Sequence, residues 1–405
     1  MGHFHFEVPP AVNEAFLQAR WQDAYICGIE GIPWQCRCRY EDAKLTITRS
    51  IDASGKLHLV CPVGQLGDRS LSTCSLREVD RPYLLYVELA RGSCFRVQSQ
   101  ADAWQRAGLA LEPRFEESLL TGTKQFLDAV SLLDDADRAS SKAIEAIETL
   151  ESACDLLGDS YTKQSLAFRK RQEPQIGTLL AGTLIPPAPS RSKHEKEYCT
   201  TFNAAAVRLN WADIENDAGR YDYDDAKRSI QWCADNQIRV IGGPLLDFRE
   251  RMMPHWLYLL EDDFEALLAA IVQFTERTVT ELRGTVQLWN AASGLNSKGP
   301  ISVDDEKSMR IALGILQTIR RLDPGTPAIM SFDQPFGEYL SKDRNGISPL
   351  HFADAIARSG LGMAGIGLDI RFNYESQSTF ERSAVDFGLM IDRWATLGLP
   401  LLATI

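Results

Sequence analysis

The stretch between residues 238 and 289 decides the fold. It opens with the apolar run IRVIGGPLL at residues 238–246 and closes with TVQLW at residues 285–289. Between these runs, residues 262–283 carry apolar side chains at helical spacing, at Phe264, Leu267, Leu268, Ile271, Val272 and Phe274. Short apolar runs on either side of one long amphipathic segment are typical of two parallel strands joined by a crossover helix. The stretch therefore predicts a strand–helix–strand unit.

The same alternation extends in both directions along the chain. Strands are predicted at residues 176–184, 204–209, 238–246, 285–289, 328–332, 365–372 and 400–404, and helices at residues 224–236, 262–283, 303–322, 350–359 and 379–397. A doubly wound sheet and a barrel both fit seven such strands. No GxGxxG follows the first strand, and no phosphate-binding loop occurs. The α/β fold class predicted for residues 173–405 is therefore a (β/α)8 TIM-type barrel.

The residues before the barrel show a different pattern of apolar side chains. Short β-like runs at residues 44–49, 56–60 and 83–88 predict a small all-β sandwich or jelly roll over residues 1–110, with DASG at residues 52–55 as a hairpin loop between the first two runs. Such a module would bind carbohydrate or another protein. Apolar residues at helical spacing predict a helical hairpin over residues 111–172.

Composition limits the classes of partner. With 405 residues and a net charge of −12, the chain is long enough for two or three domains and is a poor match for nucleic acid or an anionic membrane. No apolar run has the length of a membrane span, and the start MGHFHFEVPP lacks the pattern of a secretory signal. Nine scattered cysteines indicate free thiols, so we expect a cytoplasmic protein. The six histidines show no ligand spacing, and we expect no metal or cofactor; the oligomeric state is open.

Six short motifs resemble one known family when they are taken in order. They are the Phe202-Asn203 pair with WADIE and GRYDY at residues 211–215 and 219–223, DNQIRVIGGPL at 235–245, MPHW at 253–256, RGTVQLWN at 283–290, GIGL at 365–368, and ATLGLP at 395–400. Over residues 175–405 this series resembles the barrel of glycoside hydrolase family 10, the xylanase family. WNAASGL at residues 289–295, with the preceding sandwich and hairpin, resembles a divergent group of such proteins from planctomycete-type bacteria.

The resemblance implies a β-linked polysaccharide or oligosaccharide as ligand, but the catalytic glutamates are missing. The acid/base of the family corresponds to Gly294, and the nucleophile corresponds to Ile405. Ser293 replaces the family's asparagine before the acid/base, and Asn210 replaces a lysine that grips sugar. Because an eighth strand does not follow residue 405, we expect the sequence to be part of a longer chain.

Other carboxylates lie where the predicted strands end. Asp247, Asp369 and Glu375 are candidates for relocated catalytic groups, and Asp333 is a candidate for substrate binding. Barrel enzymes carry their chemistry at this end of the strands. The alternative is that these carboxylates cap helices, pair with Arg249 or Arg371, or face solvent.

Trp289, Asn290, Ser293 and Asn210 complete the set of predicted substrate contacts. Trp289 would form a platform for a sugar ring, unless it belongs to the barrel core. Two functions follow. The first is a family 10-like hydrolase with relocated carboxylates. The second is a carbohydrate-binding or scaffold protein that has kept the barrel without the chemistry.

Overall fold

The computed structural model describes residues 2–173, 177–185, 193–249, 252–297, 299–343, 346–372 and 379–405. The chain divides into two compact units. The N-terminal unit comprises Met1–Ile176, Phe336–Asn345 and Phe372–Asp392. The barrel unit comprises Gly177–Pro335, Gly346–Arg371 and Arg393–Ile405. The predicted sandwich and helical hairpin thus fall into one unit, which also takes in two segments from the C-terminal half of the chain.

Two four-stranded sheets form the β part of the N-terminal unit. One has the order β4 (Cys36–Glu41), β5 (Lys44–Arg49), β1 (Gly2–Glu7) and β8 (Tyr83–Leu84). The other has the order β3 (Pro33–Trp34), β2 (Tyr25–Cys27), β6 (Lys56–Pro62) and β7 (Asp68–Ser72). Side chains alternate between buried and partly buried along β1, as one covered sheet face requires. Both sheets contribute to a single apolar core, to which Phe4, Phe6, Ile47, Leu57 and Leu59 belong.

Two local predictions in this unit are wrong. The strands at residues 44–49 and 56–60 do not form a hairpin, because β5 pairs with β1 and β4 whereas β6 pairs with β2 and β7. The strand predicted at residues 83–88 is a strand only at Tyr83–Leu84, and α2 (Leu85–Arg106) follows at once. A short apolar run does not distinguish a strand from the first turns of a buried helix.

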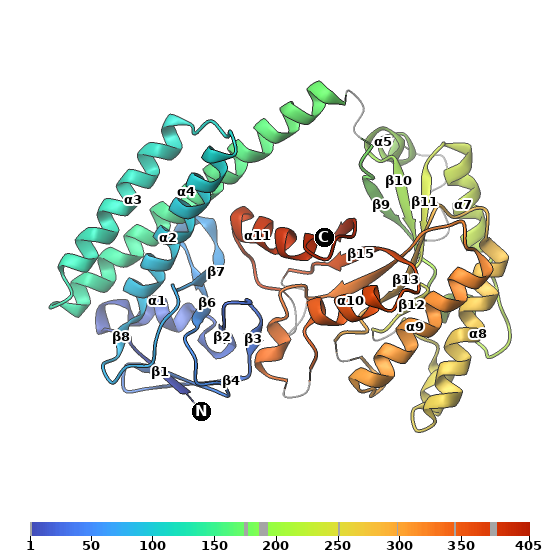
Figure 1. Cartoon of the computed structure of the whole chain (residues 1–405), viewed down its shortest axis with the longest axis horizontal. Coiled ribbons are helices and arrows are strands. Elements are labelled where there is room, and N and C mark those ends of the chain that lie inside the picture. Colours follow the sequence, from blue (N-terminus) through green and yellow to red (C-terminus); the bar gives the residue numbers. More distant parts are fainter. Residues whose placement is uncertain are drawn as a thin grey trace. The chain divides into compact units, whose positions relative to one another are not determined.

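Three helices cover the sheets and complete the core. The helices α2, α3 (Pro113–Ser131) and α4 (Ala136–Gln172) lie side by side in Figure 1, which confirms the predicted helical hairpin. Asp135 caps α4 by accepting a hydrogen bond from the backbone N–H of Arg138 at 3.2 Å. Between α2 and α4, the buried Arg96 pairs with the buried Glu151, which also accepts a hydrogen bond from Ser93 Oγ at 2.7 Å. The unit also includes the short α1 (Asn13–Gln18).

The barrel unit contains the predicted parallel sheet. Its strands follow in chain order, and all pairs are parallel: β9 (Ala181–Leu184), β10 (Ala204–Val207), β11 (Arg239–Gly242), β13 (Leu288–Ser293), β14 (Ala328–Asp333), β15 (Met363–Asp369) and β16 (Leu401–Thr404). The short β12 (Leu246–Asp247) adds to β13. This is the strand order of a (β/α)8 barrel over seven strands, as predicted.

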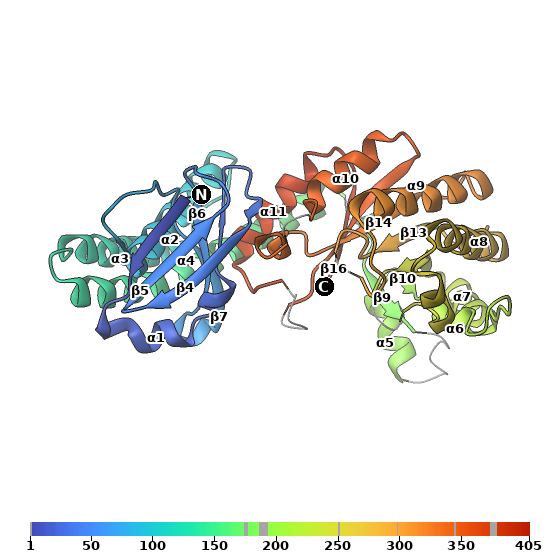
Figure 2. The ribbon, with the colours of Figure 1, turned by 90° about the horizontal axis from the view of Figure 1, so that it is seen from below.

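Helices alternate with these strands. They are α5 (Lys193–Thr201), α6 (Trp211–Ile214), α7 (Asp224–Asp235), α8 (Phe264–Leu282), α9 (Asp305–Leu322) and α10 (Pro349–Arg358), and α11 (Ala384–Ala395) precedes β16. Figure 2 shows α7, α8 and α9 along the outer side of the sheet. The strand predicted at residues 238–246 is divided into β11 and β12, because Gly243 adopts a φ of +123°. None of the described helices combines the length and apolarity that a membrane span needs.

A close approach between α2 and β7 gives a test of the packing. A Cβ atom on Gly92 would lie 1.7 Å from the backbone oxygen of Ser72. We expect Gly92→Ala to lower the free energy of unfolding by about 3 kcal/mol, because neither backbone can move away without opening the core. Gly314→Ala in α9 is the matched control, since its nearest neighbours would lie at 3.5 Å; it should be neutral or stabilising by up to about 1 kcal/mol. Equal melting temperatures for Gly92→Ala and the wild type would contradict this close packing of α2 against β7.

Candidate functional site

Strand register gathers polar side chains at the carboxyl end of the barrel sheet. Asp247 of β12 is paired with Ser293 of β13, and Asp369 of β15 is paired with both Asp333 of β14 and Thr404 of β16. Side chains at paired positions of parallel strands point to the same side of a sheet. The register thus brings together three of the four carboxylates that the sequence predicts as a site. The fourth, Glu375, lies outside the described residues.

Asp247 is held by Arg249. The Nε and one terminal nitrogen of the guanidinium donate to the two carboxylate oxygens, so the pair is bidentate. Asp247 is 6% exposed, whereas the Arg249 side chain is 26% exposed. The anion is therefore neutralised from the protein side, while part of the cation faces solvent. This is the alternative that the sequence left open, a carboxylate paired with Arg249.

Asp369 is bound by a hydroxyl instead of a cation. Ser293 Oγ donates a hydrogen bond to its carboxylate, and the residue is only 7% exposed. Burial raises the pKa of the Asp369 carboxyl, and the Ser293 hydrogen bond and the charge of Arg249 offset part of that increase. Ser293, predicted to contact substrate, thus has a partner inside the protein.

Asp333 completes the group. Its carboxylate lies 3.7 Å from a guanidinium nitrogen of Arg371 and 3.5 Å from Ser297 Oγ. Burial raises the pKa of Asp333 to about 6, and the neighbouring charge of Asp369 adds to the increase. Two 2.8 Å hydrogen bonds between the Asn296 side chain and the Asp333 backbone fix the strand end. We call Asp247, Arg249, Ser293, Asp333, Asp369 and Arg371 the carboxyl-end cluster.

Gly294 and Ile405, the two positions at which the sequence resemblance predicts glutamates to be missing, lie at the same end of the sheet. Gly294 directly follows β13 and adopts a φ of +79°, a conformation that favours glycine. A Cβ there would have room, since its nearest neighbour would be Arg249 Cγ at 3.6 Å. Ile405 follows β16 and is exposed. Neither side chain can give or accept a proton.

The remaining predicted contacts divide into core and rim. Trp289 is fully buried, and its indole N–H donates to Asp323 at 2.9 Å, so it belongs to the barrel core and offers no platform for a ring. Asn290 is half-buried and donates to Ser331 Oγ at 3.0 Å. Asn210 donates to Asp213 at 2.9 Å just before α6, so its partner is not a member of the cluster.

Sequence reasoning missed Asn296, Ser297 and Ser331 as supporting residues. Asn296 and Ser297 lie three and four residues after the end of β13, and Ser331 lies two residues before Asp333 on β14. The signal was available, because residues two apart on a strand share a face and polar residues after a strand reach its carboxyl end. Among the described residues, no group of three or more His, Cys, Asp or Glu is arranged to hold a metal ion.

Comparison with known proteins adds similarities of fold. No protein-family model and no curated protein matches the chain. Solved structures similar to it include xylanase 10B from Thermotoga maritima, with 17% identity over 56% of this chain and 69% of that chain and a TM-score of 0.44. Xylanase 10B from Thermotoga petrophila RKU-1 in complex with xylobiose is 18% identical over 55% of this chain and 68% of that chain, with a TM-score of 0.44. GH10 from Paenibacillus barcinonensis is 14% identical over 56% of this chain and 68% of that chain, with a TM-score of 0.45.

The raised pKa of Asp333 predicts a pH-dependent stability. The folded carboxyl has a pKa of about 6, against roughly 3.9 in an unfolded chain. The folded state therefore binds more protons between these values, and stability falls as pH rises from about 4 to 6. We expect Asp333→Asn to be more stable than the wild type at pH 7, by up to about 2 kcal/mol, with the gain disappearing near pH 4.

Thermal melts of both proteins from pH 4 to pH 8 measure this effect. Asp128→Asn, an exposed change on α3 that alters the net charge equally, is the control. A constant difference between Asp333→Asn and the wild type across this range would contradict the prediction.

Proposed function

We propose that the carboxyl-end cluster binds a neutral, β-linked oligosaccharide or polysaccharide, and that the chain does not hydrolyse it through a pair of carboxylates. One observation carries the proposal. Each carboxylate of the cluster already has a cation or a hydroxyl of the protein as partner, and the positions of the family's two glutamates hold Gly294 and Ile405. The site has polar groups for recognition without free groups for the chemistry.

Binding is supported by the way the cations are placed. Arg249 and Arg371 are each more than a quarter exposed, whereas the carboxylates they face are mostly buried. The buried anions hold the guanidinium groups in place, and both arginine side chains remain partly exposed to solvent. Planar donors held in this way suit pairs of neighbouring sugar hydroxyls. Three carboxylates against two cations give no strong attraction for an anionic ligand.

Hydrolysis makes demands that the cluster does not meet. A retaining glycosidase needs one ionised nucleophile and one protonated acid on opposite sides of the scissile bond. Both carboxylate oxygens of Asp247 accept hydrogen bonds from Arg249, so this carboxylate is occupied inside the protein. Asp333 and Asp369 are paired neighbours, and each already contacts a side chain of the protein, Arg371 and Ser293 respectively, so neither is set apart as a nucleophile or as an acid.

One observation favours hydrolysis as a second candidate. A carboxyl with a pKa of about 6, like Asp333, has the acidity of a general acid that works near neutral pH. Asp247 would then serve as the partner carboxylate. The two functions differ in whether products appear, so one assay separates them.

Arg249 gives the binding test. Arg249→Lys keeps the charge but loses the bidentate contact with Asp247, and we expect about tenfold weaker binding of a neutral β-linked glycan. Arg283→Lys, an exposed arginine after α8, is the matched control and should bind like the wild type. Calorimetric titration with soluble β-linked glycans measures both. Equal affinities for the two variants, or no binding of any glycan by the wild type, would refute the proposal.

Release of reducing ends tests the second candidate. We expect the wild type to release none from xylan or other β-linked glycans. If products do form, a rate that falls on Asp333→Asn and declines above about pH 6 would replace the binding function with hydrolysis, because loss of the Asp333 proton removes the acid. Asp128→Asn again controls for the change in net charge.

A further inference from the structure

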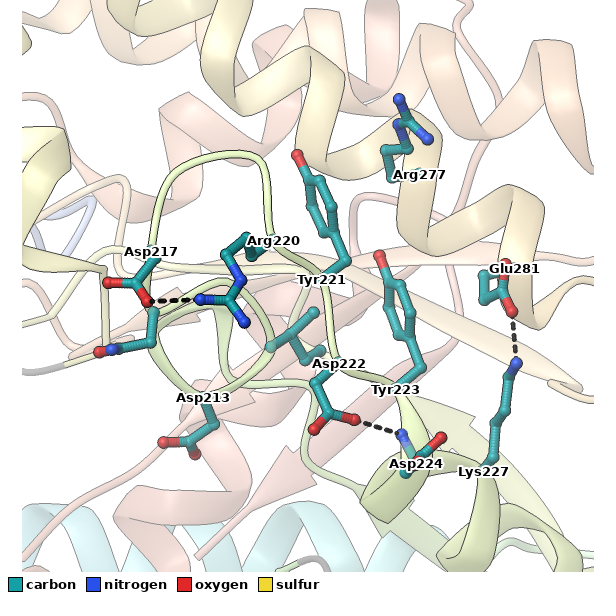
Figure 3. Close-up of a pocket in the computed structure, with 12 residues that line it drawn as sticks. Asp213, Asp217, Arg220, Tyr221, Asp222, Tyr223, Asp224, Lys227, Arg277 and Glu281 are labelled. Carbon is teal, nitrogen blue, oxygen red and sulfur yellow. Dashed lines mark hydrogen bonds and ion pairs between the residues drawn. The ribbon is translucent and has the colours of Figure 1, made fainter.

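A hollow on the barrel unit shares no residue with the carboxyl-end cluster. The hollow measures about 730 Å³ and is bounded by residues 213–227 and by α8. Its lining includes Tyr221, Tyr223, Asp222, Arg220 and Arg277, shown in Figure 3. This volume is in the range of sites that take small ligands.

The loop that forms the hollow is held in place from beneath. Glu215 is buried and accepts hydrogen bonds from the Trp211 indole at 2.8 Å and from the Gly219 backbone at 2.7 Å. Asp222 N donates to Ile214 O at 2.8 Å, which closes the loop on α6. A cavity whose walls are fixed before binding loses less entropy when a ligand enters.

Two tyrosines form one wall. The rings of Tyr221 and Tyr223 are parallel, with an angle of 4° between their planes and 6.2 Å between their centres. Both side chains point toward α8 in Figure 3. The Tyr223 hydroxyl lies 3.1 Å from Oγ1 of Thr278, a residue of that helix. Burial raises the pKa of each phenol to about 12, so both are neutral at pH 7. Neutral aromatic rings with a polar tip are suited to a ligand that is apolar on one face and hydroxylated at its edge.

The charged side chains around the hollow make weak contacts that hydrogen bonds to a ligand can replace. Arg220 and Asp217 form an ion pair at 3.8 Å, with both side chains largely exposed, and such pairs contribute little to stability. Arg277 lies 5.7 Å from the centre of the Tyr221 ring and is exposed. The lining carries five carboxylates against three cations, which disfavours phosphates and other anions. Carboxylates and guanidinium groups around an aromatic wall provide both acceptors and donors for hydroxyls.

We infer that this hollow binds one or two sugar residues of a neutral glycan, as a second carbohydrate site beside the carboxyl-end cluster. The inference takes its ligand class from the proposed function but depends on different residues. A chain with two such sites would hold two short glycans, or one glycan long enough to reach both places on the barrel unit, and only in the second case would avidity exceed the affinity of either site.

Amide hydrogen exchange, measured with and without xylohexaose or cellohexaose, reports on the two sites separately. We expect slower exchange in peptides covering residues 211–224 for the hollow, and in peptides covering Asp247 and Ser293 for the cluster. Tyr221→Ala should raise the glycan concentration needed to protect the hollow about tenfold, and it should leave the protection of the cluster unchanged. Tyr161→Ala, a partly exposed tyrosine on α4, is the matched control and should change neither. If Tyr221→Ala melts early, Arg277→Gln serves as the second variant, with the same expectation.

The outcomes separate the two proposals. Protection at the cluster without protection at residues 211–224 overturns the hollow alone. Protection at residues 211–224 that survives both variants also overturns it, and so does protection produced by calcium chloride but not by glycan, because the hollow would then attract cations. Protection of the hollow alone, lost in Tyr221→Ala, supports it and refutes the cluster.

Discussion

Burial of three carboxylates at one end of a parallel sheet is the constraint on which the candidate site depends. Removing a carboxylate from water costs several kcal/mol unless a cation or a hydrogen bond compensates for it. Arg249 compensates Asp247, Ser293 compensates Asp369, and Arg371 with Ser297 partly compensates Asp333. The compensation is incomplete at Asp333 and Asp369, because burial raises the pKa of both carboxyls, that of Asp333 to about 6. Stability and site chemistry are thus set by the same contacts.

Much of the barrel could be predicted from the sequence because its central strands, such as β14, are buried on both faces. Continuous apolar runs such as residues 328–332, separated by long amphipathic helices, leave little choice of secondary structure. The N-terminal unit was harder. The run at residues 83–88 has the composition of a strand, yet Leu85 begins α2, because only the packing of the following residues decides between the two. Sheet membership of β5 and β6 likewise depends on contacts distant in the chain.

The site was predictable in its location but not in its pairing. Asp247, Asp333 and Asp369 could be found because they lie near or just after the C-terminal ends of predicted strands, and the register brings them together. Their partners could not be fixed in the same way. Arg249 lies two residues after Asp247, but only the path of the chain beyond β12 turns it back onto the carboxylate. Trp289 shows the reverse case. It ends the strand predicted at residues 285–289, but in the structure it is the second residue of β13, and its contact with Asp323 belongs to the core.

The glycine at position 294 has a further consequence for the cluster. A glutamate there would place another carboxylate close to Arg249, whose Cγ would lie 3.6 Å from the new Cβ. Arg249 would then be shared between two anions, and Asp247, almost fully buried, would lose part of its compensation. With glycine, Arg249 remains bound to Asp247, and its exposed part stays directed to solvent. Glycine at position 294 and the bidentate Arg249–Asp247 pair are therefore compatible features of one arrangement.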